Sequence, residues 1–359
     1  MEQITPTNKN KTKIIVLVIG LFIIAGVGLA FFVPSQEERI KNYKEEKRQE
    51  KIEEKLEQSE GEVLDGSVSG EDGASVIPNT NSSNVSGPIS YSEDYTVTTK
   101  KDIVYGTASG MNLKIDIYTP NGVDGTTPAV LYIHGGGFKG GSKNGVADDS
   151  LMLAKHGVAV VAIDYRLSGT AVFPAPLHDI KGVARYVKAN ASEYNINPDA
   201  LFTLGESAGG VLASLMGVTE GNTTLEGTIG GNTGYNSNIA GVINISGSYV
   251  ASIVDTMSGG IKNSIGNEVG CSPVPSTACE SVYEALSPET YISSGDSPFL
   301  ILHGAKDQSV PTIQATTLDT KLTAVGIASD VYVASDLAHV GGLLARYLDE
   351  VISFINTNS

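Results

Sequence analysis

One stretch restricts the fold of this chain more than any other: residues 205–210, with the sequence Gly-Glu-Ser-Ala-Gly-Gly. The apolar run 200–204 before it is typical of a short buried strand, and the apolar residues 211–216 after it are typical of a helix. The glycines let the backbone turn sharply between the two elements, because they have no Cβ that would clash. Such a turn lifts the Ser207 hydroxyl above the carboxyl end of a sheet, where it can attack a carbonyl group if a base accepts its proton.

The same residues would also occur in a glycine-rich turn whose serine has no catalytic role. The surrounding pattern therefore decides between a nucleophile turn and an ordinary strand-to-helix turn. From about Tyr95 onward, short apolar runs alternate with longer helical patterns. Strands are expected at residues 101–105, 112–118, 129–133, 158–163, 200–204, 239–245, 298–303 and 329–334. Helices are expected at residues 149–156, 176–194, 211–216, 313–325 and 342–355. The first two strands read as a hairpin, and the rest predict an α/β fold with a mostly parallel sheet covered by helices on both faces.

A second glycine-rich segment follows the strand expected at residues 129–133. It reads His134-Gly135-Gly136-Gly137. Attack on an ester turns the carbonyl oxygen into an oxyanion, which bare glycine N–H groups can approach closely, at about 3 kcal/mol for each well-placed donor. Gly136, Gly137 and Ala208 are the expected donors. A phosphate-binding loop is the alternative, but no Lys-Ser/Thr pair follows at the required place.

An acid and a base are expected at the ends of the later strands. Asp307 lies just past the strand expected at residues 298–303, about a hundred residues after Ser207. Of the five histidines, only His339 follows Asp307. The order serine, acid, histidine is the one found on an α/β-hydrolase sheet. Asp330 and Asp336 are rival acids, but they come too close before His339 to belong to the preceding strand end.

These motifs resemble those of a known group of enzymes. Residues 134–137 and 205–210 resemble the α/β-hydrolase esterases of the hormone-sensitive-lipase-like group. Three further stretches, residues 164–168, 173–181 and 225–232, are similar to the bifunctional feruloyl and acetyl-xylan esterase type. The likeness covers about residue 95 to the C-terminus.

The resemblance implies a serine esterase that needs no metal and no organic cofactor. It assigns the roles of nucleophile, acid, base and oxyanion-hole donors in this chain to Ser207, Asp307, His339, Gly136, Gly137 and Ala208. It also implies an α/β-hydrolase fold at residues 95–359.

Composition excludes other classes of function. The formal net charge is −16 and the isoelectric point is near 4.7, so no basic surface is available to displace counterions from nucleic acid. Cysteine and histidine residues do not cluster at metal-ligand spacing, so no metal site is expected. The oligomeric state does not follow from the sequence.

The N-terminal part has a different texture. After a short polar tail, residues 1–13, an uninterrupted apolar run at residues 14–33 is long enough to span a membrane. It is interpreted as a single transmembrane signal-anchor, with a signal peptide that is cleaved to release a secreted protein as the alternative. Residues 34–94 read as a charged stalk followed by a Gly-, Ser- and Asn-rich flexible linker. The catalytic part is expected outside the cytoplasm.

A long insertion separates two of the core strands. Residues 248–297 exceed a plain strand connection, and a lid over the site is expected there. The chain has two cysteines, Cys271 and Cys279, and both lie in this insertion. A disulfide between them would make the lid rigid and would be stable only outside the cytosol, whereas two free thiols in a loop are the alternative.

Taken together, these features favour a serine carboxylic-ester hydrolase that works through an acyl-enzyme. Its expected substrates are small soluble esters or acetyl and feruloyl groups on polysaccharide. Two alternatives are a serine peptidase on the same fold and a non-catalytic, hydrolase-like adhesion domain. The peptidase is disfavoured because no separate domain is present to screen peptides, and the adhesion domain because the serine, acid and histidine are all retained.

Overall fold

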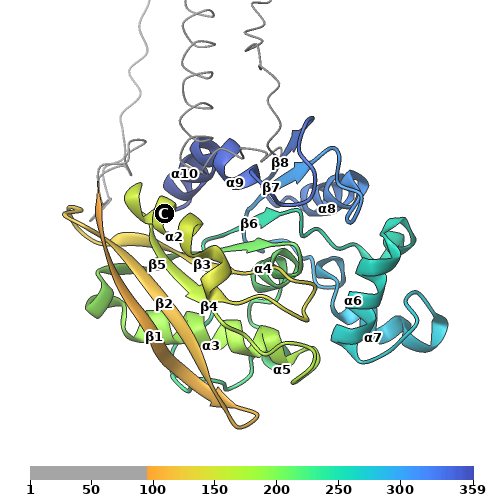
Figure 1. Ribbon diagram of the computed structural model, residues 1–359, viewed down its shortest axis with the longest axis horizontal. Coiled ribbons are helices and arrows are strands. Elements are labelled where there is room, and N and C mark those ends of the chain that lie inside the picture. Colours follow the sequence, from red (N-terminus) through yellow and green to blue (C-terminus); the bar gives the residue numbers. More distant parts are fainter. Residues whose placement is uncertain (1–94) are drawn as a thin grey trace, which may run out of the picture. The chain divides into compact units, whose positions relative to one another are not determined.

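The computed structural model describes residues 95–359, and the transmembrane and stalk predictions for residues 1–94 lie outside the described residues. The described residues build an eight-stranded sheet with the strand order β1-β2-β4-β3-β5-β6-β7-β8 (Figure 1). The strands are β1 (Thr96–Ala108), β2 (Met111–Asn121), β3 (Thr127–Ile133), β4 (Ala159–Ile163), β5 (Ile196–Glu206), β6 (Gly241–Ile245), β7 (Phe299–Gly304) and β8 (Ser329–Ala334). No helix at residues 95–359 has both the length and the apolar character that a bilayer-spanning segment requires.

The sheet is mostly parallel, as the sequence predicts. β1 and β2 form an antiparallel hairpin, and β2 pairs antiparallel with β4. Every later pairing, from β4–β3 to β7–β8, is parallel. The carboxyl ends of β3, β5, β7 and β8 therefore meet at one edge of the sheet, where the loops with the predicted site residues begin.

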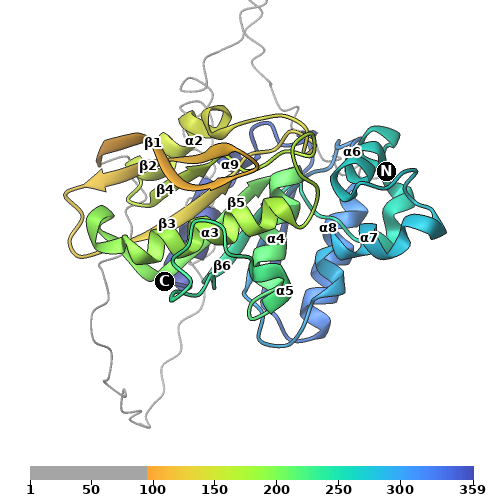
Figure 2. The same ribbon diagram turned by 90° about the horizontal axis from the view of Figure 1, so that it is seen from below.

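Helices cover both faces of the sheet (Figure 2). The main ones are α2 (Ala147–Lys155), α3 (Ala175–Ala189), α4 (Ala208–Val218), α8 (Thr312–Ala324) and α10 (Leu348–Thr357). Adjacent residues of β5 show how the faces divide, because side chains alternate along a strand. The ring of Phe202 packs edge-on against Phe354 of α10, with centroids 6.1 Å apart, whereas the Thr203 hydroxyl donates to the Ala213 carbonyl of α4 at 3.2 Å. The expected two-sided covering is thus confirmed.

Two expected helices end differently in the structure. The helix expected at residues 176–194 stops at Ala189, and a 3₁₀ turn, η2 (Ala191–Tyr194), replaces its last turn. The single C-terminal helix expected at residues 342–355 is two helices, α9 (Leu343–Arg346) and α10, with non-helical torsions at Tyr347 (φ −112°, ψ 30°). The Tyr347 ring packs on Tyr332 of β8, with centroids 5.4 Å apart. Tertiary packing therefore overrides the local helical pattern at this point.

The segment at residues 248–297 joins β6 to β7 and is helical. It contains η3 (Ala251–Thr256), α6 (Gly259–Val269), η4 (Thr277–Cys279), α7 (Glu280–Ala285) and η5 (Pro288–Thr290). α6 and α7 lie beyond the end of α4, at one side of the sheet (Figures 1 and 2). Ser258 caps the N-terminus of α6 by accepting the Ile261 N–H at 3.3 Å, and Gly270 ends it in the left-handed conformation.

A buried ion pair ties the loop after β4 to α3. The Arg166 guanidinium donates from Nε and Nη2 to the Asp179 carboxylate at 2.7–3.0 Å, and the Arg166 N–H donates to the same carboxylate at 2.9 Å. Asp179 is completely buried. Burial raises the pKa of Asp179 above its ordinary value, although the hydrogen bonds from Arg166 oppose the shift. The pair fixes the residues that precede α3 and therefore has a structural role.

Replacing Asp179 by Ala is expected to lower the free energy of unfolding by about 3 kcal/mol, because it leaves the Arg166 charge buried without its partner. Asp336→Ala is the matched control, since it breaks the solvent-exposed Arg346–Asp336 pair and is expected to cost less than about 1 kcal/mol. Denaturant titration of the two variants measures the difference. Equal losses would show that the Arg166–Asp179 pair contributes no more than a surface pair.

Candidate active site

Ser207 lies in a strained turn between β5 and α4. Its torsion angles are φ 51° and ψ −118°, a conformation that L-residues rarely adopt and that surrounding structure must enforce. A Cβ at Gly205 would overlap the Gly209 carbonyl oxygen, and a Cβ at Gly209 would overlap that of Ile133 in β3. Glycine is therefore required on both sides of Ser207, and the turn holds the Ser207 hydroxyl at the N-terminus of α4.

His339 joins Ser207 to Asp307 by two hydrogen bonds. Its Nε2 lies 2.9 Å from Ser207 Oγ, and its Nδ1 lies 2.6 Å from Asp307 Oδ2. Asp307 follows β7 and His339 follows β8, so the three side chains come from the ends of β5, β7 and β8. The residues around His339 are also held, because the Val340 N–H donates to Ser246 Oγ at 3.3 Å. The structure thus brings together the serine, acid and histidine that the sequence singles out.

Asp307 is held in its ionised form. Burial alone would raise its pKa, but hydrogen bonds from His339 and from the backbone N–H groups of Val310 and Ser309 outweigh that effect and keep the pKa below its ordinary value. Both N–H groups donate to Oδ1 at 2.9 Å, which leaves Oδ2 for His339. A carboxylate with one oxygen fixed in this way presents the other in a defined direction to the imidazole.

Neither the rival acids Asp330 and Asp336 nor the neighbouring His303 takes the place of Asp307 or His339. Asp330 lies exposed on β8. Asp336 pairs with Arg346 at 2.9 Å on the surface. His303 is fully buried in β7, and its Nε2 lies 2.8 Å from the Val310 carbonyl. Burial lowers the pKa of His303, so the neutral imidazole donates this hydrogen bond and steadies the loop that carries Asp307.

The glycine loop after β3 lies beside Ser207. A Cβ at Gly135 would be 2.9 Å from the Glu206 carbonyl oxygen, so the loop and the serine turn approach each other closely. Gly136 (φ 123°) and Gly137 (φ 60°) adopt torsions that favour glycine. Within residues 95–359, the backbone N–H groups of Gly136, Gly137 and Ala208 donate to no protein acceptor. They are thus available to a ligand oxygen.

The loop is supported from behind by Tyr165, a residue to which the sequence motifs assign no role in the site. The Tyr165 hydroxyl donates to the His134 carbonyl at 2.9 Å, and its ring stacks on the His134 imidazole with centroids 4.4 Å apart. The His134 Nδ1 lies 2.7 Å from the Gly135 carbonyl. These contacts fix the start of the loop and therefore the direction of the N–H groups that follow.

A small, mostly apolar pocket opens next to Ser207. The segment at residues 248–297, the glycine loop and α4 contribute its walls, and α6 supplies three of the residues. The lining residues are Gly137, Phe138, Ser207, Ala208, Val211, Gly247, Ser248, Tyr249, Met257, Ile261, Ser264, Ile265 and Val310. A Cβ at Gly137 would lie 2.9 Å from Ser264 Oγ, so α6 lies directly over the glycine loop.

Glu206 forms a second polar cluster behind the serine. The Tyr132 hydroxyl of β3 lies 2.8 Å from Glu206 Oε1 and 3.2 Å from Asp149 Oδ2 of α2. Burial raises the pKa of Glu206 to about 6, and the nearby Asp149 adds to the shift, whereas Tyr132 and His339 oppose it. Glu206 therefore changes charge in the pH range in which histidines titrate, one residue from Ser207.

Replacing Glu206 by Gln is expected to lower kcat/KM roughly threefold to tenfold at pH 8 and to have little effect at pH 5. Above pH 6 the Glu206 carboxylate is ionised and stabilises positive charge on His339, an interaction of about 1 kcal/mol in a partly solvated site, whereas below pH 6 it is neutral like glutamine. The pH profile of ester hydrolysis from pH 5 to 9 measures the effect. A ratio of variant to wild type that is constant over this range would contradict it.

The two cysteines are joined. Cys271 and Cys279 form a disulfide with a Cα–Cα distance of 5.6 Å, which links the residue two positions after α6 to the end of η4, directly before α7.

At residues 95–359, no group of three or more His, Cys, Asp or Glu side chains is arranged to hold a metal ion.

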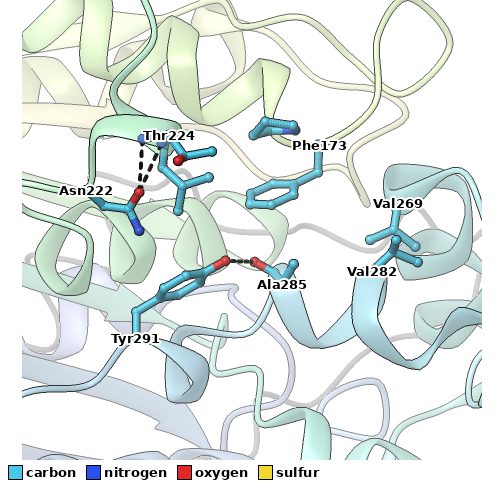
Figure 3. A pocket seen from close by; sticks show the side chains of 9 residues that line it. Phe173, Asn222, Thr224, Val269, Val282, Ala285 and Tyr291 are labelled. Carbon is cyan, nitrogen blue, oxygen red and sulfur yellow. Dashed lines mark hydrogen bonds between the residues drawn. The ribbon is translucent and has the colours of Figure 1, made fainter.

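A second pocket lies between the segment at residues 248–297 and the residues around α5 (Thr223–Glu226). Figure 3 shows the Phe173 ring pointing into it and the Tyr291 hydroxyl, which donates to the Ala285 carbonyl at 2.9 Å, closing one side. Its lining residues are Phe173, Pro174, Asn222, Thr224, Leu225, Val269, Val282, Ala285 and Tyr291. It shares no lining residue with the pocket at Ser207.

Curated proteins with similar sequences are ester hydrolases. A probable carboxylic ester hydrolase, LipM of Mycobacterium tuberculosis, is 32% identical over 235 residues, which cover 64% of this chain and 53% of that protein. An isoprenylcysteine α-carbonyl methylesterase of Arabidopsis thaliana is 25% identical over 75% of this chain and 64% of its own length. The chain thus spans between half and two thirds of the length of these relatives.

Solved structures share the fold. A truncated carbohydrate esterase from gut microbiota superposes with a TM-score of 0.66 at 24% identity and covers 75% of this chain and 98% of its own. A bifunctional GH43-CE protein of Bacteroides eggerthii gives a TM-score of 0.64 at 26% identity, over 72% of this chain and 35% of its own. The family model BD-FAE matches residues 115–322, more than half of the chain. The chain therefore belongs to the BD-FAE family and has an α/β-hydrolase fold.

Proposed function

We propose that this chain is a serine carboxylic-ester hydrolase that works through an acyl-enzyme. The observation that carries the proposal is the continuous hydrogen-bonded chain from Ser207 Oγ through His339 to Asp307 Oδ2, at 2.9 and 2.6 Å. A nucleophile, a base within hydrogen-bond reach and a third group that orients the base form the arrangement required for acyl transfer. The ester hydrolases among its relatives support the same conclusion.

In the first half of the reaction, His339 Nε2 accepts the proton of Ser207 Oγ as this oxygen attacks the ester carbonyl carbon. The carbonyl oxygen becomes an oxyanion, which the N–H groups of Gly136, Gly137 and Ala208 stabilise. Asp307 stabilises the imidazolium through its hydrogen bond to Nδ1. The imidazolium then donates its proton to the leaving alcohol, which leaves the acyl group on Ser207.

In the second half, water takes the place of the alcohol. His339 accepts a proton from the water molecule, whose oxygen attacks the acyl carbon and forms a second oxyanion at the same N–H groups. Collapse of this intermediate releases the carboxylic acid and returns the proton to Ser207 Oγ. No metal or organic cofactor takes part in either half of this proposed mechanism.

The proposed substrates are acetyl or feruloyl esters on polysaccharide. Membership of the BD-FAE family and the fold shared with a carbohydrate esterase support this choice. The small apolar pocket lies directly beside Ser207, where the acyl group would be bound. Residues 248–297 act as a lid in this proposal, because α6 supplies Ile261, Ser264 and Ile265 to the wall of that pocket.

Ester hydrolysis by the full-length protein tests the proposal. The panel contains nitrophenyl acetate, nitrophenyl esters of longer acids, methyl ferulate and acetylated xylan. Turnover of any ester, together with covalent capture of a fluorophosphonate at Ser207 detected by mass spectrometry, is the expected result. A folded protein that turns over no ester and captures no probe would overturn the proposal, and the panel otherwise separates acetyl from feruloyl preference.

We also propose that residues 14–33 anchor the protein in a membrane with residues 95–359 outside the cytoplasm. The Cys271–Cys279 disulfide supports this location, because disulfides persist in oxidising compartments. Protease treatment of intact cells is expected to remove the domain at residues 95–359. Full protection of this domain, in cells whose other exposed proteins are digested, would contradict the proposed orientation.

A further inference from the structure

Glu268, near the C-terminal end of α6, is buried without a partner. Its exposed fraction is 0%, and neither carboxylate oxygen has a hydrogen-bond partner within residues 95–359. An ionised carboxylate in such surroundings is strongly destabilised, so the neutral acid is the form that fits the closed structure. Burial raises the pKa of Glu268 to about 8, with no contribution from a neighbouring charge.

The carboxyl group lies on the side of α6 that covers the active site. Ile261, Ser264 and Ile265 line the pocket at Ser207. Glu268 follows Ser264 by four residues and Ile265 by three, so it continues the same stripe of the helix one turn further on. The helix face that closes the site therefore ends in an acid that must be neutral for this face to stay buried.

Among residues 95–359, the groups that face Glu268 offer no positive charge. A polar group near Glu268 is Tyr165, in the loop after β4. Burial raises the pKa of Tyr165, and a charge on Glu268 would raise it further. The Tyr165 hydroxyl already donates its hydrogen bond to the His134 carbonyl and is not hydrogen-bonded to Glu268. From the loop before α3, the Phe173 N–H donates to the Glu268 backbone carbonyl at 2.8 Å, which seats the end of α6 without touching the carboxyl group.

Within the part of the chain that the structure describes, no other charged group compensates for a Glu268 charge. On α7, which packs against α6, the acids Glu280 and Glu284 are exposed to solvent. Arg166, which lies next to Tyr165 in the sequence, forms its ion pair with Asp179 at 2.7 Å. An ionised Glu268 would thus stay unpaired as long as α6 remains in place.

We propose that Glu268 is a proton-operated latch of the lid: the protonated acid lets α6 lie over Ser207, and loss of its proton to water displaces the end of α6 from its seat. The disulfide makes the displacement extend to α7, because Cys271 follows α6 by two residues and is bonded to Cys279 directly before α7. Residues 259–285 are therefore expected to move together. The displacement itself stands on the burial of Glu268, whereas its effect on turnover rests on the proposed esterase function.

The sign of the pH dependence follows from the two pKa values. Glu268 has a pKa of about 8 with the lid closed and its ordinary value of 4.5 when it is exposed. The open lid therefore binds fewer protons than the closed lid between these values, and closure weakens as the pH rises. The equilibrium constant for opening should increase about tenfold for each pH unit between pH 5.5 and 7.5 and should level off above pH 8.

Hydrogen exchange of the full-length protein, followed by mass spectrometry from pH 5.5 to 9, tests the latch. After correction for the intrinsic exchange rate at each pH, protection of amides at residues 259–269 in the wild type is expected to fall about 100-fold between pH 5.5 and 7.5. Amides of β3 and β5 should keep their protection over the same range. Protection of α6 that is independent of pH in the wild type would overturn the proposal without any variant.

Two variants identify the group responsible. Glu268→Gln keeps the shape of the side chain, and Glu268→Met removes its polar atoms, so either one that folds should hold α6 protected at every pH. Glu284→Gln on α7 is the matched control, since this exposed acid should leave the wild-type pH dependence unchanged. If the amide protection of α6 still fell with rising pH in both Glu268 variants, Glu268 would not be the group that controls its displacement.

A turnover measurement separates the latch from the proposed chemistry. If the protein hydrolyses esters, Glu268→Gln is expected to remove one component from the pH dependence of KM for bulky esters, because entry past α6 no longer follows a proton. Hydrogen exchange does not depend on ester hydrolysis. Absence of turnover together with pH-dependent exchange would therefore reject the esterase and keep the latch, whereas turnover with pH-independent exchange would do the opposite.

Discussion

Replacing Ser207 by Ala is expected to reduce kcat for ester hydrolysis by about 10⁴-fold or more, which corresponds to about 5.5 kcal/mol of lost transition-state stabilisation. Without Oγ no acyl-enzyme forms, and His339 has no nucleophile to activate. Any residual rate then comes from water attack assisted by the N–H groups of Gly136, Gly137 and Ala208. Steady-state kinetics with nitrophenyl acetate measure the loss.

Ser248→Ala is the matched control for this variant. Ser248 lines the same pocket and is buried, but it is hydrogen-bonded neither to His339 nor to Asp307. Its removal should change kcat less than tenfold. A Ser207→Ala protein that remains within tenfold of the wild type, with its fold intact, would show that another group attacks the ester.

The sequence predicts the framework of the sheet because the buried strands carry their own signal. Residues 129–133 and 329–334 are apolar or alternating runs bounded by turn residues, and the structure has strands there with shifts of no more than two residues. β5 is longer than the expected residues 200–204, because its polar start pairs with β3, where Ile196 lies opposite Thr127. The residue at which a strand begins or ends therefore depends on its pairing partner, and the periodicity of the sequence gives no information about that partner.

The three residues of the hydrogen-bonded chain could be selected from the sequence because strand ends and chain order restrict them. Only one histidine follows Asp307, and the parallel sheet places the ends of β5, β7 and β8 on one edge. The supporting groups could not be selected in this way. In the sequence, Tyr132 does not differ from the apolar residues of its strand, and Tyr165 does not differ from other loop residues. The pairing of β3 with β4 and β5 places both of them behind the site, and this pairing cannot be read from the sequence pattern.

The burial of Glu268 cannot be predicted from the sequence either. An acid among Gly, Asn and Ser residues near a helix end reads as a solvated side chain, and no pattern in residues 259–269 indicates the loop at residues 165–173 that covers it. Buried polar groups of this kind depend on contacts between segments about a hundred residues apart. Only the folded structure reveals them.

Asp307→Asn is expected to lower kcat by about 10⁴-fold while the fold stays intact. The reason lies in the two oxygens of Asp307. Oδ1 accepts the N–H groups of Ser309 and Val310, both at 2.9 Å, so an asparagine must turn its own oxygen toward these donors. Its NH₂ group then faces His339 Nδ1, which has to accept a hydrogen bond instead of donating one.

This reversal puts the imidazole proton on Nε2, the nitrogen that lies 2.9 Å from Ser207 Oγ. A protonated Nε2 cannot accept the serine proton, so the base is lost although every atom but one is unchanged. Nearly unchanged thermal stability combined with a 10⁴-fold lower kcat is the expected result, and His339 ring nitrogen shifts in NMR spectra report the tautomer. Loss of activity with Nε2 still unprotonated would mean that Asp307 acts through its charge alone and not by selecting the tautomer of His339.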